Sequence, residues 1–439
     1  MSDATGEQPS LGRDDWRLLS DETRCEVLRL PPSDEAEDLF VSLSPDEQAE
    51  VVLLLPGPER RFWLRALPPD DLADLLQAVA DEDDRHALFA LLDDHTQSQV
   101  TALLAYAEDD AGGLMSPRYA RLRPDMRVAE AIEYLRMQAR LRVETLYYAY
   151  VLDHEQHLLG VVSFRELIAA PSDRLVSQMM EEDLVCVEED MDQEEVGRLI
   201  SEHDLLAVPV VDAERRLKGI VTVDDIVDVV EEEATEDIQK MGGSQALDLP
   251  YLRTNVLGML RKRAPWLTAL FLGEMLTAAA MARYEDEIAR AVVLALFIPL
   301  IISSGGNSGS QATTLVIRAM ALGEVRGRDW WRVFVRELLT GLCLGLILGL
   351  IGFARVALWP NAPVVYTEYY LSVAVTVGVS LVAVVMFGTL AGSTLPFLLR
   401  RLGCDPASAS APFVATLVDV SGVLIYFNVA YLLLRRLMA

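Results

Sequence analysis

The sequence predicts a multidomain chain in three parts: an all-α superhelical amino-terminal domain, an α/β tandem pair, and a five-helix α-helical transmembrane domain. Three observations predict this class. The first 250 residues hold 57 acidic and 22 basic side chains, whereas the remainder hold 10 and 16. Residues 146–226 contain a repeat with a period of 59, and five long apolar stretches follow residue 264. The chain therefore joins an acidic, water-exposed region to an apolar, weakly basic one.

The composition excludes several classes of protein. With 51% hydrophobic residues, the 439-residue chain is too apolar to be disordered as a whole. Its net charge of -29 disfavours nucleic-acid binding, because neutralising phosphates requires a basic face. No CxxC pair occurs among the four cysteines, which argues against a disulfide framework or a thiolate zinc site: Cys25, Cys186, Cys343 and Cys404. The chain has no GxxxxGK[ST] loop and no nucleophile arrangement, so neither an enzyme nor an ATP-driven pump is predicted.

Residues 1–14 are expected to be a disordered tail, and residues 15–112 an acidic helical domain. Ser44-Pro45-Asp46-Glu47 is a capping box with proline at the first helical position, and Pro68-Pro69-Asp70-Asp71 is a looser copy. Short amphipathic helices stacked as a small superhelix are the expected result. Their acidic faces are solubilising unless another acidic surface is brought against them.

The duplicated region aligns Tyr150 to Ser163 with Pro209 to Thr222. Each copy predicts a strand, a tight turn at an aspartate, a second strand, and a helix starting at Arg165 or Asp224. Duplicated units of this size usually pack as a pair.

Residues 229–254 are expected to connect this pair to the membrane domain. Val229 to Lys240 predicts a helix that ends at Gly242 and Gly243, with carboxylates on successive turns. One interpretation is a solvated acidic helix. The other is that the helix and the acidic modules repel each other unless cations bind between their surfaces.

Residues 255–439 are expected to form the transmembrane domain, because each apolar stretch approaches the ~20 residues that cross ~30 Å of hydrocarbon. The stretches begin near Pro265, Ala291, Leu338, Leu371 and Pro412. The spacing of Gly341, Gly345 and Gly349 indicates a helix-packing face.

Basic residues beside the spans predict the orientation, because they are retained on the cytoplasmic side. They precede the first span and separate the second from the third and the fourth from the fifth: Arg261, Lys262, Arg263, Arg318, Arg326, Arg328, Arg332, Arg336, Arg400 and Arg401. The loop Tyr284–Glu287 is acidic. The amino-terminal half should be cytoplasmic and the carboxyl terminus outside, although Arg435 and Arg436 argue against the latter. No cleavable signal peptide is expected, because residues 1–30 lack an apolar core.

Polar residues inside the spans require a partner or a function. Asp419 lies at the middle of the fifth span and is either a structural hydrogen-bonding residue or part of a cation site on a water-filled pore. Ser303 to Gln311 predicts a break in the second span, with close helix packing by its glycines as the alternative. Glu274 in the first span is expected to be buried in the bundle, and Glu337 to lie near the cytoplasmic mouth.

The duplicated modules resemble a tandem of CBS modules, with copies at residues 113–175 and 176–228. The order of all the parts resembles the MgtE family of magnesium channels and transporters over nearly the entire chain. Its specific motifs are Phe297-Ile298-Pro299, Gly305 to Gln311, Asp405-Pro406-Ala407, and Ala415 to Gly422.

The resemblance implies a homodimer in the bilayer of the bacterial inner (plasma) membrane, with the pore between subunits and no nucleic-acid partner. Hydrated Mg²⁺ would be held by Asp419 and by backbone oxygens of Ala415 and Gly422, with Asp405 and Glu337 near the cytoplasmic end. The family's Mg²⁺-sensing ligands fall on Asp192, Glu194, Ser201 (by its carbonyl), Asp204, Asp225, Glu233, Glu236 and Asp237. Mg²⁺ is thus implied as both substrate and regulator.

The implied mechanism is passive Mg²⁺ uptake that regulatory Mg²⁺ closes by bridging the acidic surfaces and holding the connecting helix as a plug. ATP could bind the CBS pair, although its usual contacts overlap the sensing residues. Ala411 and Glu274 depart from residues seen in relatives and could alter ion preference. Two alternatives stay open: transport of another divalent cation (Mn²⁺, Co²⁺ or Ni²⁺), and a membrane-anchored CBS sensor that conducts nothing.

Overall fold

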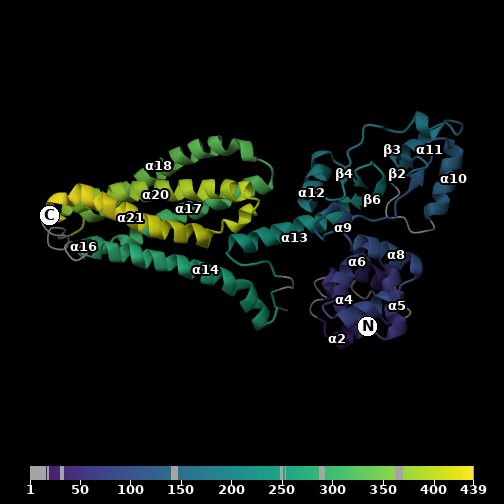
Figure 1. Ribbon diagram of the computed structural model, residues 1–439, viewed down its shortest axis with the longest axis horizontal. Coiled ribbons are helices and arrows are strands. Elements are labelled where there is room, and N and C mark those ends of the chain that lie inside the picture. The colour runs from purple at the N-terminus through teal and green to yellow at the C-terminus, as the bar shows by residue number, and fades with distance from the viewer. Residues whose placement is uncertain are drawn as a thin grey trace, which may run out of the picture. The chain divides into compact units, whose positions relative to one another are not determined.

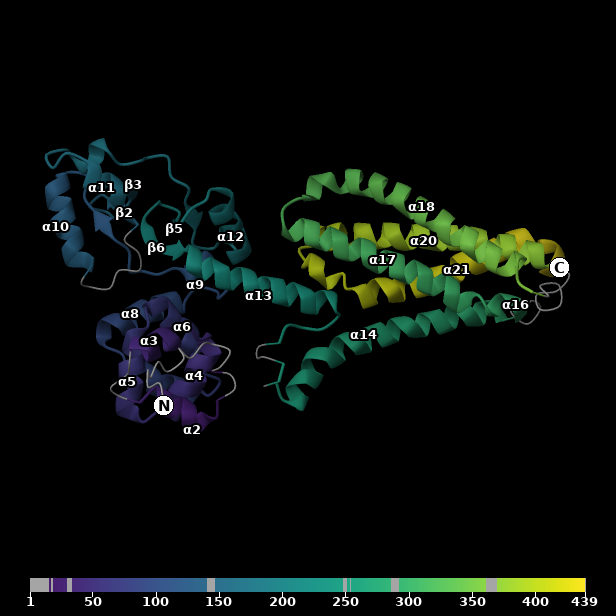
Figure 2. The same ribbon diagram turned by 180° about the vertical axis from the view of Figure 1, so that it is seen from behind.

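The computed structural model describes Trp16 and residues 19–29, 34–139, 147–247, 251–252, 254–285, 292–360 and 369–438. It divides into two compact units, Met1–Glu232 and Glu233–Ala439, and Figures 1 and 2 show the helices and strands of each from opposite sides. The tail expected at residues 1–14 lies outside the described residues, as do Asp286 and Glu287 of the acidic loop. The side chains of Arg435 and Arg436 also lie outside the description.

The amino-terminal domain is helical, as predicted. Its helices are α2 (Asp21–Val27), α3 (Asp34–Val41), α4 (Pro45–Leu54), α5 (Gly57–Ala66), α6 (Pro69–Ala78), α7 (Glu82–Phe89) and α8 (Asp94–Leu103). Both hydrogen bonds of the capping box at the start of α4 are present: Glu47 N donates to Ser44 Oγ, and Ser44 N donates to the Glu47 carboxylate. The looser copy starts α6 with Pro69 at the first helical position and no side-chain cap.

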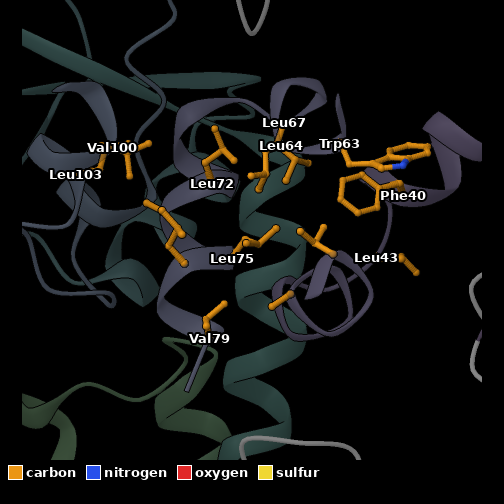
Figure 3. Close-up of a cluster of buried hydrophobic side chains, with 14 of the residues drawn as sticks. Phe40, Leu43, Trp63, Leu64, Leu67, Leu72, Leu75, Val79, Val100 and Leu103 are labelled. Atoms are coloured by element: carbon orange, nitrogen blue, oxygen red, sulfur yellow. The ribbon is translucent and has the colours of Figure 1, made fainter. Parts of the chain in front are cut away.

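Alternate helices of this domain pack on one another, α2 on α4, α4 on α6 and α6 on α8, which confirms the superhelix. Figure 3 shows the apolar side chains that meet inside it, including Phe40, Trp63 and Leu75. The Trp63 indole donates to the Leu28 carbonyl at 3.0 Å, so this large side chain is buried without an unpaired N–H group.

The two α/β copies each contain a three-stranded sheet. The first is built from β1 (Arg121–Leu122), β2 (Tyr148–Leu152) and β3 (Leu158–Ser163), and the second from β4 (Val187–Glu188), β5 (Ala207–Val211) and β6 (Leu217–Thr222). In each sheet the first pair is parallel and the second antiparallel. The short helix α9 (Ala111–Leu114) precedes the pair, and α10 (Val128–Gln138), α11 (Phe164–Ala169) and α12 (Gln193–Glu202) complete the copies.

The predicted turns form at Asp153 and Asp212, whose carboxylates accept backbone N–H groups two and four residues later. The helices that follow begin at Phe164 and Val223, one residue earlier than expected. The second of these, α13 (Val223–Met241), continues without interruption through the predicted connecting segment. The last helix of the second copy and the connecting helix are therefore one element.

Within its described residues, the carboxyl-terminal unit contains five helices long and apolar enough to cross a membrane. They are α14 (Val256–Arg283), α17 (Ile298–Ala321), preceded by the short α16 (Val292–Ala295), α18 (Trp330–Ala357), α20 (Tyr370–Arg401) and α21 (Ala411–Met438). Short 3₁₀ turns, η3 (Gly327–Asp329) and η4 (Pro406–Ser408), precede α18 and α21. This number matches the five stretches predicted from the sequence.

The predicted break at Ser303 to Gln311 is wrong, because α17 is a continuous α-helix across it. Its glycines serve close packing instead. A Cβ placed on Gly305 would lie 2.6 Å from Val384 Cγ1, and one on Gly309 would lie 2.8 Å from the Gly388 carbonyl oxygen. The third span behaves as predicted, because Gly345 likewise leaves no room for a Cβ against Val382 of α20.

Candidate functional site

Close packing of α17 on α21 fixes the depth of Asp419. A Cβ on Gly306 would lie 3.7 Å from Cα of Ala415, and one on Gly422 would lie 3.6 Å from Cγ1 of Ile302. Ser310 Oγ donates to the Ala411 carbonyl at 3.2 Å. Asp419 therefore lies beside the first third of α17, between the levels of Ile302 and Gly306.

A polar stripe runs along the exposed side of α17 at this depth. Its members recur every three or four residues and are exposed in the single chain: Ser303, Asn307, Gln311 and Thr314. Many residues on the other sides of the helix are buried and apolar, among them Ile301, Ala312 and Val316. Exposed amides and hydroxyls within a membrane span are stable only against water or other protein.

The first span brings a second carboxylate to Asp419. The Glu274 carboxyl group is within hydrogen-bonding reach of Asp419. A Cβ on the neighbouring Gly273 would lie 2.8 Å from Cγ2 of Thr416, one turn before Asp419. Glu274 is exposed in the single chain, whereas the sequence predicted burial in the bundle. The reason is that α14 packs mainly on α21 and buries none of its own residues.

Contacts at both ends of α14 support this alignment. Near its start, the Trp266 indole donates to Ser410 Oγ at 3.1 Å. Near its end, Tyr284 stacks on Phe427 with ring centroids 4.8 Å apart, and the Asn428 amide donates to the Tyr284 hydroxyl. Since α14 follows α21 over most of its length, the pairing of Glu274 with Asp419 is part of the helix packing.

Asp405 is held near the other end of α21 and contacts the connecting helix. Its carboxylate accepts the Ala407 N–H at 2.8 Å and receives an ion pair from Lys240 Nζ at 2.7 Å. Lys240 also pairs with Glu236 one turn earlier in α13. Burial alone would lower the pKa of Lys240, but its hydrogen bonds to the two carboxylates raise it, so the ammonium group stays charged.

The end of α13 is packed against the ends of the spans. Met241 contacts the cluster of Ile317, Ala407 and Ala409, and a Cβ on Gly243 would lie 3.0 Å from the Trp266 ring. Gly243 has a φ of 78°, which explains why glycine ends this helix. Burial, followed by repulsion from Asp405 and Glu233, raises the pKa of Asp237 to about 6. Glu337 is partly buried within α18.

In the amino-terminal unit, the predicted sensing residues lie on the second α/β copy. Asp192 caps α12 by accepting the Glu194 N–H at 2.9 Å, and its side chain is exposed, as are those of Glu194, Ser201 and Asp204. Asp225 accepts from the N–H and hydroxyl of Thr222 at the start of α13. Among the described residues, no three His, Cys, Asp or Glu side chains are grouped closely enough to hold a metal ion.

The structure adds Asp74, which the sequence analysis did not single out. This residue of α6 is partly buried and faces acidic residues of α13 and of the segment after α8. Burial, followed by repulsion from Glu108, Asp225 and Glu232, raises its pKa to about 7. The only sequence signal was its acidic, amphipathic helix, which does not identify the opposing surface.

Comparisons with known proteins cover both units. The family model described as divalent cation transporter (MgtE) matches residues 298–429, that of the MgtE intracellular N domain matches residues 14–109, and that of the CBS domain matches residues 111–173 and 176–232. A magnesium transporter MgtE of Thermus thermophilus is 45% identical over 96% of this chain and 92% of that relative. One of Enterococcus faecalis is 38% identical over 77% of this chain and 72% of that relative.

A solved structure is also similar to the amino-terminal unit: the cytosolic domain of the Mg²⁺ channel MgtE in complex with ATP. It is 47% identical with a TM-score of 0.47, over 49% of this chain and 87% of that chain.

Proposed function

The chain belongs to the MgtE family of magnesium transporters, and from this premise we propose that it is a passive Mg²⁺ uptake channel of the bacterial inner membrane. The observation that carries the proposal is the polar stripe of α17 beside Asp419 of α21. A partly exposed carboxylate beside a row of exposed amides and hydroxyls suits a water-filled cation path, whereas a membrane anchor requires none of them.

We propose that a second copy completes this path. The stripe and Asp419 are at least partly exposed in the single chain, so another subunit placed against α17 and α21 would enclose them. A two-fold arrangement would bring two Asp419 carboxylates to one pore, with carbonyl oxygens of Ala415 and Gly422 on either side. Hydrated Mg²⁺ suits such oxygen-rich surroundings, because it releases water reluctantly and favours octahedral oxygen coordination.

We place Asp405 and Glu337 at the cytoplasmic mouth of the path. Asp405 contacts α13, which follows the cytosolic modules directly. Five crossings from a cytosolic amino-terminal half would put the carboxyl terminus outside. The inside-negative membrane potential then drives Mg²⁺ inward without a catalytic step. The domain boundaries that we propose are those expected from the sequence. The one difference is that the connecting helix is the second part of α13, whose first part belongs to the second CBS module.

Regulatory Mg²⁺ would act on the cytoplasmic carboxylates. Asp74 faces Asp225 and Glu232, and this repulsion would be relieved by a divalent cation bound by carboxylate oxygens. The sensing set would consist of the residues named from the sequence together with Asp74: Asp192, Glu194, Ser201, Asp204, Asp225, Glu233, Glu236 and Asp237. Bound Mg²⁺ would hold α13 against the spans and close the path, and its release would free α13.

Uptake by liposomes that contain the purified full-length protein tests the path. Under an inside-negative potential we expect Mg²⁺ entry into wild-type liposomes and at least a ~100-fold loss with Asp419→Ala, because a mid-membrane cation site loses its charge. Glu285→Ala, which removes an exposed carboxylate beyond α14, should transport normally. Normal uptake by Asp419→Ala would contradict the proposed path.

The same assay separates the alternatives. Entry of Mn²⁺, Co²⁺ or Ni²⁺ but not of Mg²⁺ would support the proposed path and change its substrate. No entry of any of these ions would favour the alternative of a membrane-anchored CBS sensor that conducts nothing. ATP is a second candidate ligand, on the ground that CBS pairs often bind adenine nucleotides. Measuring uptake with and without ATP, over a series of internal Mg²⁺ concentrations, tests whether ATP changes the Mg²⁺ concentration that inhibits uptake.

A further inference from the structure

A hollow rimmed by arginines lies where α17 ends and α18 begins. Its volume is about 350 Å³, and its lining includes Arg326, Arg328, Arg332 and Arg336, with Glu324 and Asp329 as the acidic members. The formal charge of the lining is therefore positive. This cavity plays no part in the ion path described above.

Two of these arginines are available to a ligand. Arg332 pairs with Asp329 at 3.4 Å, and Asp329 also accepts the backbone N–H of Arg326. By contrast, the guanidinium groups of Arg328 and Arg336 are exposed and make no hydrogen bond or ion pair with another side chain in the described part of the protein. Guanidinium groups that converge on a hollow suit a phosphate, because they donate pairs of parallel hydrogen bonds to its oxygens.

The surroundings of the hollow identify the source of that phosphate. Trp330 and Trp331 are about half exposed, at 50% and 56%, and Phe334 stacks on Trp331 with ring centroids 5.3 Å apart. Exposed tryptophans next to basic residues mark the level of lipid headgroups on a membrane span. The end of α17 packs, through Ile317, against Ala407 and Met241, so the hollow is on the same side of the membrane as the connecting helix.

An apolar track leads from the hollow into the membrane. From Arg332 and Arg336 the same face of α18 continues through four exposed residues at helical spacing: Leu339, Cys343, Leu346 and Leu350. A lipid whose phosphate lies among the arginines would therefore find an apolar surface for its acyl chain directly below. A soluble phosphate would not use this track.

We propose that this hollow binds the headgroup of an anionic glycerophospholipid from the cytoplasmic leaflet, with the phosphodiester between Arg328 and Arg336 and one acyl chain along α18. The site is separate from the Mg²⁺ path and does not depend on it.

Native mass spectrometry of the full-length protein in detergent tests this site with phosphatidylglycerol and phosphatidylcholine as probes. We expect wild type to retain phosphatidylglycerol preferentially, and Arg328→Gln/Arg336→Gln to bind it about tenfold more weakly, because each arginine near a bound anionic headgroup contributes to affinity. Arg400→Gln/Arg401→Gln is the matched control, since it removes two exposed arginines from the end of α20. It should bind phosphatidylglycerol within about twofold of wild type.

Equal losses in both double variants would overturn the proposal, because the lipid would then respond only to overall charge. Displacement of the lipid by millimolar inorganic phosphate would overturn it in favour of a soluble anion. Should the glutamine variant not fold, wild type alone decides: brominated phosphatidylglycerol should quench tryptophan fluorescence more than brominated phosphatidylcholine, and Trp330→Phe/Trp331→Phe should remove the difference. Equal quenching by the two lipids would reject the site.

Discussion

The carboxylates of the amino-terminal unit and those of the membrane unit gather in opposite surroundings. Asp74 of α6 faces Asp225 and Glu232 of α13 at a partly exposed surface. Asp419 and Glu274 pair within a segment of membrane-spanning length. Repulsion at the first surface varies with the cation concentration of the solvent, which suits a sensor. A carboxylate pair inside a membrane is costly without a cation or proton, which suits a site that an ion passes through.

Neutralising three carboxylates of α13 that belong to the proposed sensing set should produce the largest regulatory change. In Asp225→Asn/Glu233→Gln/Glu236→Gln, the cation loses its ligands and the helices lose the charge that Mg²⁺ must bridge. We expect the Mg²⁺ concentration that half-inhibits uptake to rise at least about tenfold, while uptake at low Mg²⁺ stays close to wild type. Liposome uptake against a series of internal Mg²⁺ concentrations measures this.

The matched control removes three exposed carboxylates of the amino-terminal unit outside the sensing set, in Asp83→Asn/Glu182→Gln/Asp183→Asn. Its inhibition should resemble that of wild type. If Mg²⁺ inhibits Asp225→Asn/Glu233→Gln/Glu236→Gln as strongly as wild type, these three carboxylates do not sense Mg²⁺.

Glu274 offers the corresponding test in the membrane, with a smaller expected effect. Glu274→Gln keeps the shape of the side chain and removes one charge beside Asp419, so the half-saturating Mg²⁺ concentration for uptake should rise about fivefold. Glu274→Asp retains the charge and should restore most of the affinity. If Glu274→Gln equals wild type, the second carboxylate contributes nothing to the path. If it abolishes uptake as Asp419→Ala does, the two act as one inseparable site.

These regions also differ in what the sequence predicts. Five spans, the duplicated modules and the capping box at Ser44 follow from local patterns, because apolar length, a repeat and a cap are set by neighbouring residues. The break predicted in α17 was wrong because glycines that could end a helix also allow close approach to α20. Local sequence does not distinguish these two uses of glycine.

Contacts between distant residues account for what the sequence analysis missed. Glu274 meets Asp419 because Trp266 and Tyr284 fix α14 along α21, and Lys240 meets Asp405 because the end of α13 packs on the ends of the spans. Each polar residue was visible in the sequence. Its partner depended on helix register, which a single sequence does not specify.

Lys240 links the connecting helix to the end of the spans through its ion pair with Asp405. Its partly exposed ion pairs with Asp405 and Glu236 are each worth about 0.5–1 kcal/mol, since water screens them. Lys240→Met should loosen α13 and raise uptake at inhibiting Mg²⁺ about two- to fivefold. Lys240→Arg keeps the charge and should behave almost as wild type. Lower uptake in Lys240→Met would instead mean that the ion pair favours the open state.

The smallest effect is expected at Asp74 and concerns stability. Because its pKa of about 7 in the folded protein exceeds the ordinary aspartate value of 3.8, the folded state binds more protons than the unfolded chain between these limits. The associated stability is fully present below about pH 4 and is lost as the pH rises through about 7. Without Mg²⁺, the melting temperature of the full-length protein should therefore fall from about pH 5.5 to about pH 8, and Asp74→Asn should reduce this fall.

The control is Asp83→Asn, an exposed change nearby, which should leave this fall in melting temperature intact. Added Mg²⁺ should reduce the difference in melting temperature between Asp74→Asn and wild type at about pH 8. The reason is that a bound cation then replaces the proton as the group that offsets the repulsion between carboxylates. An identical pH dependence in Asp74→Asn and wild type would separate Asp74 from the charge-sensing surface and leave that surface to α13 and the second CBS module alone.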